Sequence, residues 1–158
     1  MRNSDLASVH RIQCSRYPVA CHEPQVALQS RLEAAPAFCF VAEHQGRTLA
    51  YVLAHPWRGP APRLHERLAA CDEPDHVFLH DLCVSIEAQG LACGRALFGA
   101  VEAAARLRAH ERIRIVALEQ AEGFWSRLGF QDEHQPAGEG YGRARLMARD
   151  VSKASAPT

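Results

Sequence analysis

Two glycines and an alanine crowd residues 89–94 (QGLACG), between an apolar run that ends at Val84 and a helix-like run from Arg95. Side chains this small let another molecule approach the backbone, and the N–H groups at a helix N-terminus attract anions. The stretch therefore predicts a phosphate site at a strand-to-helix turn. A dinucleotide fingerprint needs three glycines at fixed spacing, and a P-loop needs Lys-Ser/Thr where Arg95-Ala96 stands, so neither motif fits.

A histidine and an aspartate lie just before this turn, in the strand-like run VFLHDLCV. Side chains alternate along a strand, so His80 and Asp81 are expected on opposite faces, with His80 on the face of Leu82 and Val84. An imidazole, with a reference pKa of about 6.5, suits general-base work at neutral pH. His80 is the candidate base, the alternative being a histidine hydrogen-bonded within the sheet, and Asp81 is expected to anchor a neighbouring loop or helix.

Four metal-binding residue types, Cys71, His76, His80 and Cys83, follow one another at spacings of five, four and three. Residues 72–75 read as a loop, and a strand would place His80 and Cys83 on opposite faces. No paired C-x-x-C accompanies them, so no metal site is predicted.

Hydrophobic periodicity predicts one α/β domain over residues 1–151, in the order ααβββαβαββ, and a disordered tail over residues 152–158. Pro18 should end the first helix, Gln45-Gly46 should form a hairpin turn, and one helical turn is expected within residues 64–70. Helices are expected over residues 2–20, 23–35, 94–109 and 119–129, and strands over residues 38–43, 48–54, 76–86, 112–118, 130–134 and 141–150. The third helix should bury a stripe formed by Leu97, Val101 and Leu107.

Composition limits the class of protein. The chain has 158 residues, 47% of them apolar and 23% charged, which suffices for one globular domain with its own core. Eighteen basic and eighteen acidic side chains cancel without a basic stripe, so no nucleic-acid partner is expected. No long apolar run or secretory signal is visible, and six scattered cysteines suit a reduced, cytoplasmic protein that does not enter membranes.

The glycine-rich turn resembles motif A of the GNAT acyltransferase superfamily, which runs Arg/Gln-x-x-Gly-x-Gly/Ala after a strand ending in apolar-x-Val. Leu82-Cys83-Val84 and QGLACG fill that pattern, with Ala92 in place of the usual central glycine. Alanine keeps the N–H and adds one methyl, but it excludes a left-handed φ at low cost. FWSRLGF at residues 124–130 resembles the superfamily's Phe-Tyr-x-x-x-Gly-Phe pattern, and the element order is similar from about residue 3 to 151.

The resemblance implies a GNAT-like fold, a mixed and mostly antiparallel sheet with helices on both faces and a first strand that is short or absent. It also implies acetyl-CoA as cosubstrate, with the pyrophosphate against the amides of about residues 91–95 and the pantetheine along the strand that ends at Val84. Some members have a histidine where His80 stands. The residues implied in cofactor binding are Leu82, Cys83, Val84, Gln89, Gly90, Leu91, Ala92, Cys93, Gly94, Arg95 and Trp125.

The chain departs from the family pattern at the expected general acid, because Trp125 replaces the usual tyrosine. An indole N–H donates a hydrogen bond but does not usefully protonate a thiolate. Tyr141, at the expected start of the last strand, is the substitute candidate, and a proton delivered by solvent is the alternative.

The expected function is N-acetyl transfer from acetyl-CoA to a primary amine by direct attack, and the alternative is a non-catalytic acyl-CoA-binding module. The acceptor is expected to be a small-molecule or peptide amine, and a homodimer through the last hairpin is possible. The segments expected to shape the acceptor site favour neither a polycation nor a polyanion, and no single residue in them is assigned: Arg16, Tyr17, His22, Glu23, His55, Trp57 and Arg58.

Overall fold

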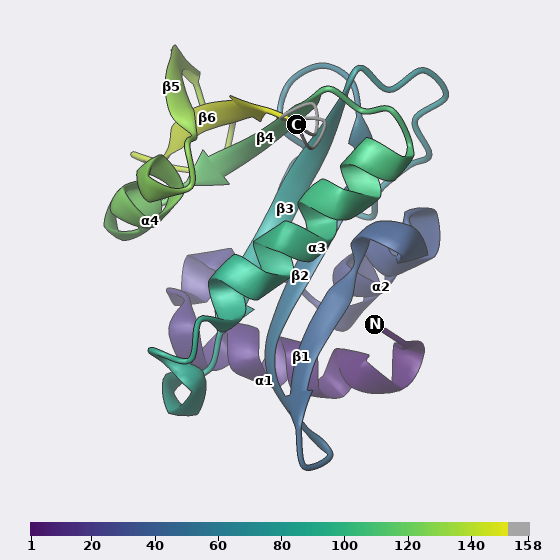
Figure 1. Ribbon diagram of the computed structural model, residues 1–158, viewed down its shortest axis with the longest axis vertical. Coiled ribbons are helices and arrows are strands. Elements are labelled where there is room, and N and C mark those ends of the chain that lie inside the picture. The colour runs from purple at the N-terminus through teal and green to yellow at the C-terminus, as the bar shows by residue number, and fades with distance from the viewer. Residues whose placement is uncertain (152–158) are drawn as a thin grey trace, which may run out of the picture.

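The computed structural model describes residues 1–151 and confirms the order ααβββαβαββ. One sheet has the strand order β1-β2-β3-β4-β6-β5, in which β3 and β4 are parallel and the other neighbours are antiparallel. Helices cover both of its faces (Figure 1). The elements are α1 (Leu6–Arg16), α2 (Gln25–Ala34), β1 (Phe40–His44), β2 (Arg47–Trp57), β3 (His76–Val84), α3 (Cys93–Leu107), β4 (Arg112–Ala117), α4 (Glu122–Arg127), β5 (Gln131–Pro136) and β6 (Arg145–Asp150).

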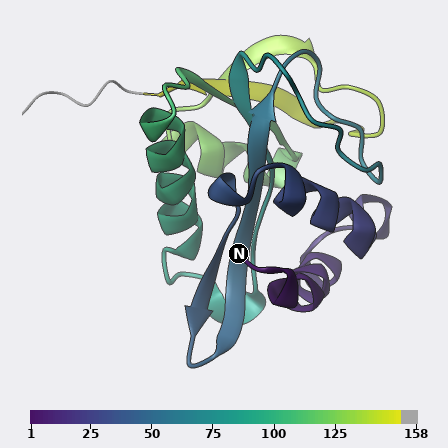
Figure 2. The same ribbon diagram turned by 90° about the vertical axis from the view of Figure 1, so that its right-hand side faces the viewer.

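The sheet separates two hydrophobic cores. Figure 2 shows α3 on one side of the sheet and α1 with α2 on the other. Leu97 of α3 and Ile115 of β4 belong to the first core, whereas Val9, Leu28 and Leu53 join α1, α2 and β2 in the second. Burial on both faces fixes the backbone of the central strands, on which the candidate site is built.

Two helices end differently from the expectation. α1 ends at Arg16, which confirms Pro18 as the stop and corrects the expected boundary at residue 20, because Tyr17 precedes Pro18 and is extended, with φ −100° and ψ 154°. The predicted stripe along α3 is confirmed for Leu97 and Val101. Leu107 is 81% exposed because the 3.6-residue period turns it away from that stripe, whereas Ala105 in the same turn is buried. Within residues 1–151, no helix is both long enough and apolar enough to cross a membrane.

The hairpin turn between β1 and β2 is confirmed. Gln45 and Gly46 both have positive φ, 48° and 73°, which is the conformation of a two-residue turn matched to the twist of the strands. The turn sets the β1–β2 pairing from His44 opposite Arg47 outward.

The connections between β2 and β3 and between β5 and β6 differ from the prediction. Residues 64–66 form a turn without helix, within the irregular segment between β2 and β3. The last strand begins at Arg145 rather than at residue 141, because Gly138, Gly140 and Gly142 have φ of 109°, 87° and 59°, which a strand does not accommodate. Tyr141 therefore lies in a loop.

Candidate active site

A groove opens where β3 and β4 separate. Their parallel pairing joins Val77–Leu79 to Ile113–Ile115 and ends there, while β4 continues alongside β6 to Ala117. The groove between them has a volume of about 750 Å³. Past Leu79, one side of β3 faces the groove instead of a strand, so the backbone groups on that side are not paired with β4. The Leu82 carbonyl accepts a hydrogen bond from the Tyr17 hydroxyl at 3.0 Å.

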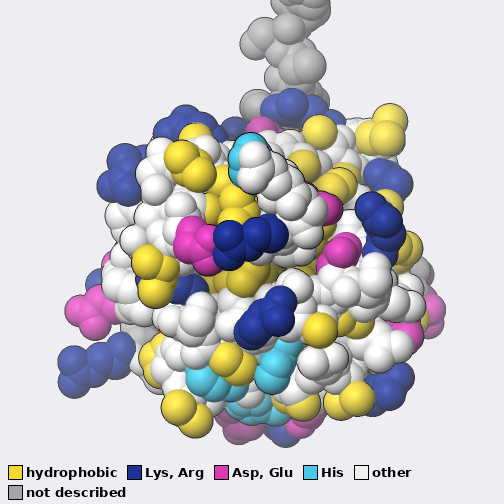
Figure 3. All heavy atoms as spheres, turned by 90° about the horizontal axis from the view of Figure 1, so that it is seen from below, with side chains coloured by type: hydrophobic (Ala, Val, Ile, Leu, Met, Phe, Trp, Pro, Cys, Tyr) yellow, Lys and Arg dark blue, Asp and Glu magenta, His cyan; other side chains and the backbone are white. Residues whose placement is uncertain are grey.

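Ten of the eleven residues expected to bind the cofactor line this groove. Leu91 is the exception, since its side chain is 63% exposed and lies outside the lining. Seen from the end of the molecule where β3 leads into residues 85–92, hydrophobic side chains lie in a hollow with arginine side chains beside it (Figure 3). The ten lining residues are Leu82, Cys83, Val84, Gln89, Gly90, Ala92, Cys93, Gly94, Arg95 and Trp125.

The turn before α3 presents free backbone amides to the groove. The first helical hydrogen bond runs from the Ala96 N–H to the Ala92 carbonyl at 3.1 Å, so the amides of Cys93, Gly94 and Arg95 precede it. The Leu91 N–H donates to the Ala88 carbonyl at 3.2 Å and is not free, which shortens the expected anion-binding segment by one residue. Unpaired amides at the positive end of a helix favour a bound anion.

Ala92 adopts the left-handed conformation that alanine was expected to exclude, with φ 59° and ψ 15°. The expectation was wrong because the turn needs this backbone geometry whichever residue occupies it. Left-handed backbone costs a residue with a β-carbon about 1–2 kcal/mol. The turn therefore holds Ala92 in strain that glycine would not have.

The two sequence motifs meet in space at Gly94. A β-carbon added at Gly94 would lie 3.2 Å from the Phe124 ring and 3.6 Å from the Leu82 side chain, so any other residue would require the Phe124 ring to shift by a few tenths of an ångström. Trp125, next to Phe124, is 6% exposed and packs edge-to-face against Phe98, with ring centroids 6.2 Å apart. Trp125 is thus both a core residue and a wall of the groove.

A β-bulge places His80 and Asp81 on the same face of the sheet, contrary to the expectation. Leu53 of β2 is opposite Asp81 and Ala54 is opposite Leu79, so His80 is the extra residue on β3. The extra residue resets the alternation, and both polar side chains then point toward α1 and α2. Leu82, expected on the face of His80, instead packs against the core beneath α3.

Asp81 is confirmed as an anchor. Its carboxylate accepts hydrogen bonds from Tyr51 at 2.5 Å, Tyr17 at 2.7 Å and the Gln13 amide at 3.1 Å. Burial raises the pKa of Asp81, and the three hydrogen bonds oppose that rise. The cluster fixes α1 and the segment after it against β2 and β3.

His80 contacts a carboxylate that the sequence analysis did not single out. His80 Nε2 lies 2.5 Å from Glu23 Oε1, and the side chains are 1% and 2% exposed. Burial alone would raise the pKa of Glu23, but the hydrogen bond to His80 and the charges of His80 and Arg31 lower it to about 2. Glu23 is therefore ionised at neutral pH.

A small recess adjoins the groove at His80. Its volume is about 60 Å³, and five residues line both cavities: Tyr17, His80, Asp81, Val116 and Leu118. The recess is also lined by Glu23 and Tyr141. Of the other residues expected around the acceptor, Arg16 lines the groove, whereas His55 is buried in β2 at 1% exposure.

Tyr141 reaches the recess from the loop between β5 and β6. Its hydroxyl donates to the Pro62 carbonyl at 2.5 Å, which joins this loop to the one between β2 and β3. Burial, followed by the negative charge of Glu23, raises the pKa of Tyr141. The phenol is therefore neutral at physiological pH, and it lies on the recess side of His80.

The four residues with metal-like spacing are not gathered into one cluster. His76 Nδ1 lies 2.5 Å from Asp75, His80 contacts Glu23, and Cys83 packs in the core beneath α1 and α2. In the part of the chain that the structure describes, no group of three or more Cys, His, Asp or Glu side chains is placed to hold a metal ion, and the six thiols are free.

Comparison with known proteins identifies relatives of this fold. The model of the Acetyltransferase (GNAT) family matches residues 6–130, and no curated protein matches the chain. Ard1 from Thermoplasma volcanium is similar with a TM-score of 0.77 and 16% identity, over 97% of this chain and 95% of that one. GphF, a GNAT-like decarboxylase in complex with isobutyryl-CoA, is similar with a TM-score of 0.74 and 20% identity, over 96% of this chain and 97% of that one. YncA from Salmonella typhimurium, solved with acetyl-CoA, is similar with a TM-score of 0.69 and 19% identity, over 100% of this chain and 95% of that one.

The strain at Ala92 yields a stability prediction. Ala92→Gly is expected to raise the free energy of unfolding by about 1 kcal/mol, because glycine adopts positive φ without a β-carbon clash. Ala100→Gly, in the regular part of α3, should lower it by about the same amount. Urea unfolding of both variants measures the difference, and a destabilised Ala92→Gly protein would contradict strain at this position.

Proposed function

Because the chain belongs to the acetyltransferase (GNAT) family, whose model covers residues 6–130, we propose that it transfers an acetyl group from acetyl-CoA to a primary amine by direct attack. One observation carries the proposal. His80 lies where the groove meets the recess, and it lines both. A base at that junction reaches an amine in the recess while a thioester occupies the groove.

The groove fits acetyl-CoA in its chemistry. The amides of Cys93, Gly94 and Arg95 at the N-terminus of α3 suit the pyrophosphate. The side of β3 that is not paired with β4 suits the pantetheine amides, which would share the Leu82 carbonyl with the Tyr17 hydroxyl. When bound, acetyl-CoA supplies a thioester whose carbonyl carbon is the target of the amine.

The residues at the junction have separate tasks in this proposal. His80 takes the proton that the amine loses as it attacks, and the leaving thiolate needs a proton in return. Tyr141 is the side-chain candidate for that second proton, with solvent as the alternative. In this structure the Tyr141 hydroxyl donates a hydrogen bond to the Pro62 carbonyl. Acid catalysis therefore requires the hydroxyl to leave that carbonyl and donate to the thiolate instead.

The recess suits the amino end of a small acceptor. A volume of about 60 Å³ equals roughly two water molecules at ~30 Å³ each, enough for a nitrogen and the first carbon beyond it. The rest of the acceptor, whether a small molecule or a peptide, lies outside the recess.

The function is tested by thiol release from acetyl-CoA over a panel of small primary amines and short peptides, with binding of acetyl-CoA measured by calorimetry. We expect binding together with turnover on at least one amine. Binding without turnover on any amine would favour the non-catalytic acyl-CoA-binding module. Absence of binding would contradict both functions.

Arg95 tests the phosphate end of the groove. Arg95→Glu places a negative charge in the first turn of α3 and should weaken acetyl-CoA binding about tenfold, or about 1.4 kcal/mol. Arg67→Glu makes the same charge change at an exposed residue outside the groove lining and should leave affinity unchanged. Equal affinities for the two variants by calorimetry would remove the anion site from this turn.

The proton transfers are tested by three substitutions. Tyr141→Phe should lower kcat ~10²-fold if the phenol is the acid, while acetyl-CoA affinity stays the same. His80→Gln cannot accept a proton and should flatten the acidic limb of kcat/KM. Trp125→Phe removes core volume but no acid, so it should cost less than tenfold in kcat. Full activity in Tyr141→Phe would assign the second proton to solvent.

A further inference from the structure

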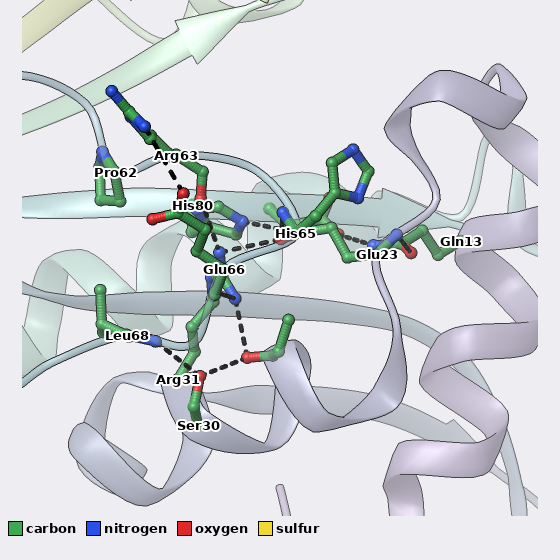
Figure 4. A network of polar contacts seen from close by, with 12 residues as sticks. Gln13, Glu23, Ser30, Arg31, Pro62, Arg63, His65, Glu66, Leu68 and His80 are labelled. Atoms are coloured by element: carbon green, nitrogen blue, oxygen red, sulfur yellow. Dashed lines mark hydrogen bonds and ion pairs between the residues drawn. The ribbon is translucent and has the colours of Figure 1, made fainter. Parts of the chain in front are cut away.

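Glu23 lies between His80 and Arg31 and contacts both of these buried side chains. Figure 4 shows His80 of β3, Glu23 of the segment before α2, and Arg31 of α2 meeting side by side. Glu23 Oε1 lies 2.5 Å from His80 Nε2 and Glu23 Oε2 lies 2.9 Å from Arg31 Nη2. None of the three side chains is more than 2% exposed.

Several contacts besides the one with His80 fix the position of Glu23. Besides Arg31, its Oε2 accepts the backbone N–H of His65 at 2.9 Å, and its own N–H donates to Gln13 Oε1 at 2.7 Å. Arg31 is fixed in turn by the carbonyls of Ala27 at 2.7 Å and Glu66 at 3.3 Å. The Glu23 oxygen that meets His80 is thus positioned by α1, α2 and the loop between β2 and β3.

An ionised carboxylate only accepts hydrogen bonds, so the proton in the short Glu23–His80 contact sits on Nε2 of the imidazole. The ring's other nitrogen, Nδ1, is buried and has no hydrogen-bond partner among the residues described. We propose that Glu23 is a positioning residue for His80, which fixes the imidazole as its Nε2–H tautomer, makes Nδ1 the basic atom, and stabilises the imidazolium that forms on proton uptake. The catalytic part of this inference rests on the proposed function.

Glu23 is not itself the base. A carboxylate whose pKa is lowered to about 2 is a weak proton acceptor at neutral pH. Carboxylates that orient a histidine in this way act through its tautomer and its cation rather than by taking the proton.

The other titratable groups around the ring leave Glu23 as its closest ionic partner. Burial, then the charge of His80, lowers the pKa of His55 to about 3, so this neighbour, with its ring centroid 6.3 Å away, is neutral. Asp81 lies on the same face, where burial raises its pKa, and the Arg31 charge is paired with Glu23. The groups facing the ring and its carboxylate are Arg31 of α2, His55 of β2, His76 and Asp81 of β3, and Tyr17, Cys21 and Tyr141 around the recess.

The test is Glu23→Gln, read first in the protein alone. The NMR titration of the His80 ring, assigned by its loss in His80→Gln, should have a midpoint at least ~1 pH unit lower in Glu23→Gln, because the imidazolium loses its carboxylate. Glu33→Gln, the same change at an exposed position of α2, should leave that midpoint unchanged. An unchanged midpoint in folded Glu23→Gln would overturn the proposal.

Kinetics then separate positioning from catalysis. In Glu23→Gln, the acidic limb of kcat/KM should move to lower pH together with the NMR midpoint, while acetyl-CoA affinity stays the same. A moved midpoint with an unmoved limb would mean that Glu23 positions a histidine that is not the base, which overturns the catalytic part. A moved midpoint in a protein that acetylates no amine would leave the positioning intact and contradict the proposed function.

Removing Glu23 alone leaves Arg31 as a buried, uncompensated charge, which can unfold a protein. Glu23→Gln combined with Arg31→Met removes both charges and should keep the fold. The lowered NMR midpoint is expected in this double variant as well, and a wild-type midpoint in it would equally overturn the proposal.

Discussion

The end of parallel pairing at Leu79 is the constraint on which the rest of the molecule depends. Two neighbouring strands in a buried sheet normally satisfy one another's backbone groups, and here they stop doing so in mid-sheet. Past this point β3 still packs against the core on the α3 side, while β4 remains paired with β6 to Ala117. The groove is thus a consequence of the different partners that the two strands keep on their other sides.

The bulge at His80 is the second departure from a regular ladder, and it lies at the point where the strands part. Without it, His80 and Asp81 would point to opposite faces, and one of the two would be buried in an apolar core without a polar partner. With the bulge, the His80 and Asp81 side chains both meet polar groups of α1 and of the segment between α1 and α2. Burying polar side chains is costly, and the structure offsets that cost by giving the carboxyl groups of Asp81 and Glu23 more than one hydrogen bond each.

Much of this architecture is predictable from the sequence, because periodicity and glycine placement are local signals. The order of elements, the Gln45-Gly46 turn and the position of residues 89–94 at the mouth of a groove all follow from them. The faces of His80 and Asp81 do not, since one extra residue in a strand leaves the pattern of residue types unchanged. The Glu23–His80 contact joins residues 57 apart in sequence, and no local signal marks it. The loop around Tyr141 is different, because three glycines in five residues (138, 140 and 142) were a visible reason to begin the last strand after them.

The hydrogen bond between Tyr141 and Pro62 has a consequence for local opening. It joins the loop between β5 and β6 to the loop between β2 and β3, and Gly138 of the first loop lies close to Ala61 of the second. Two loops fastened together do not fluctuate independently. Local opening of either loop must break this shared contact, so it costs more free energy than opening of the same loop would without the other.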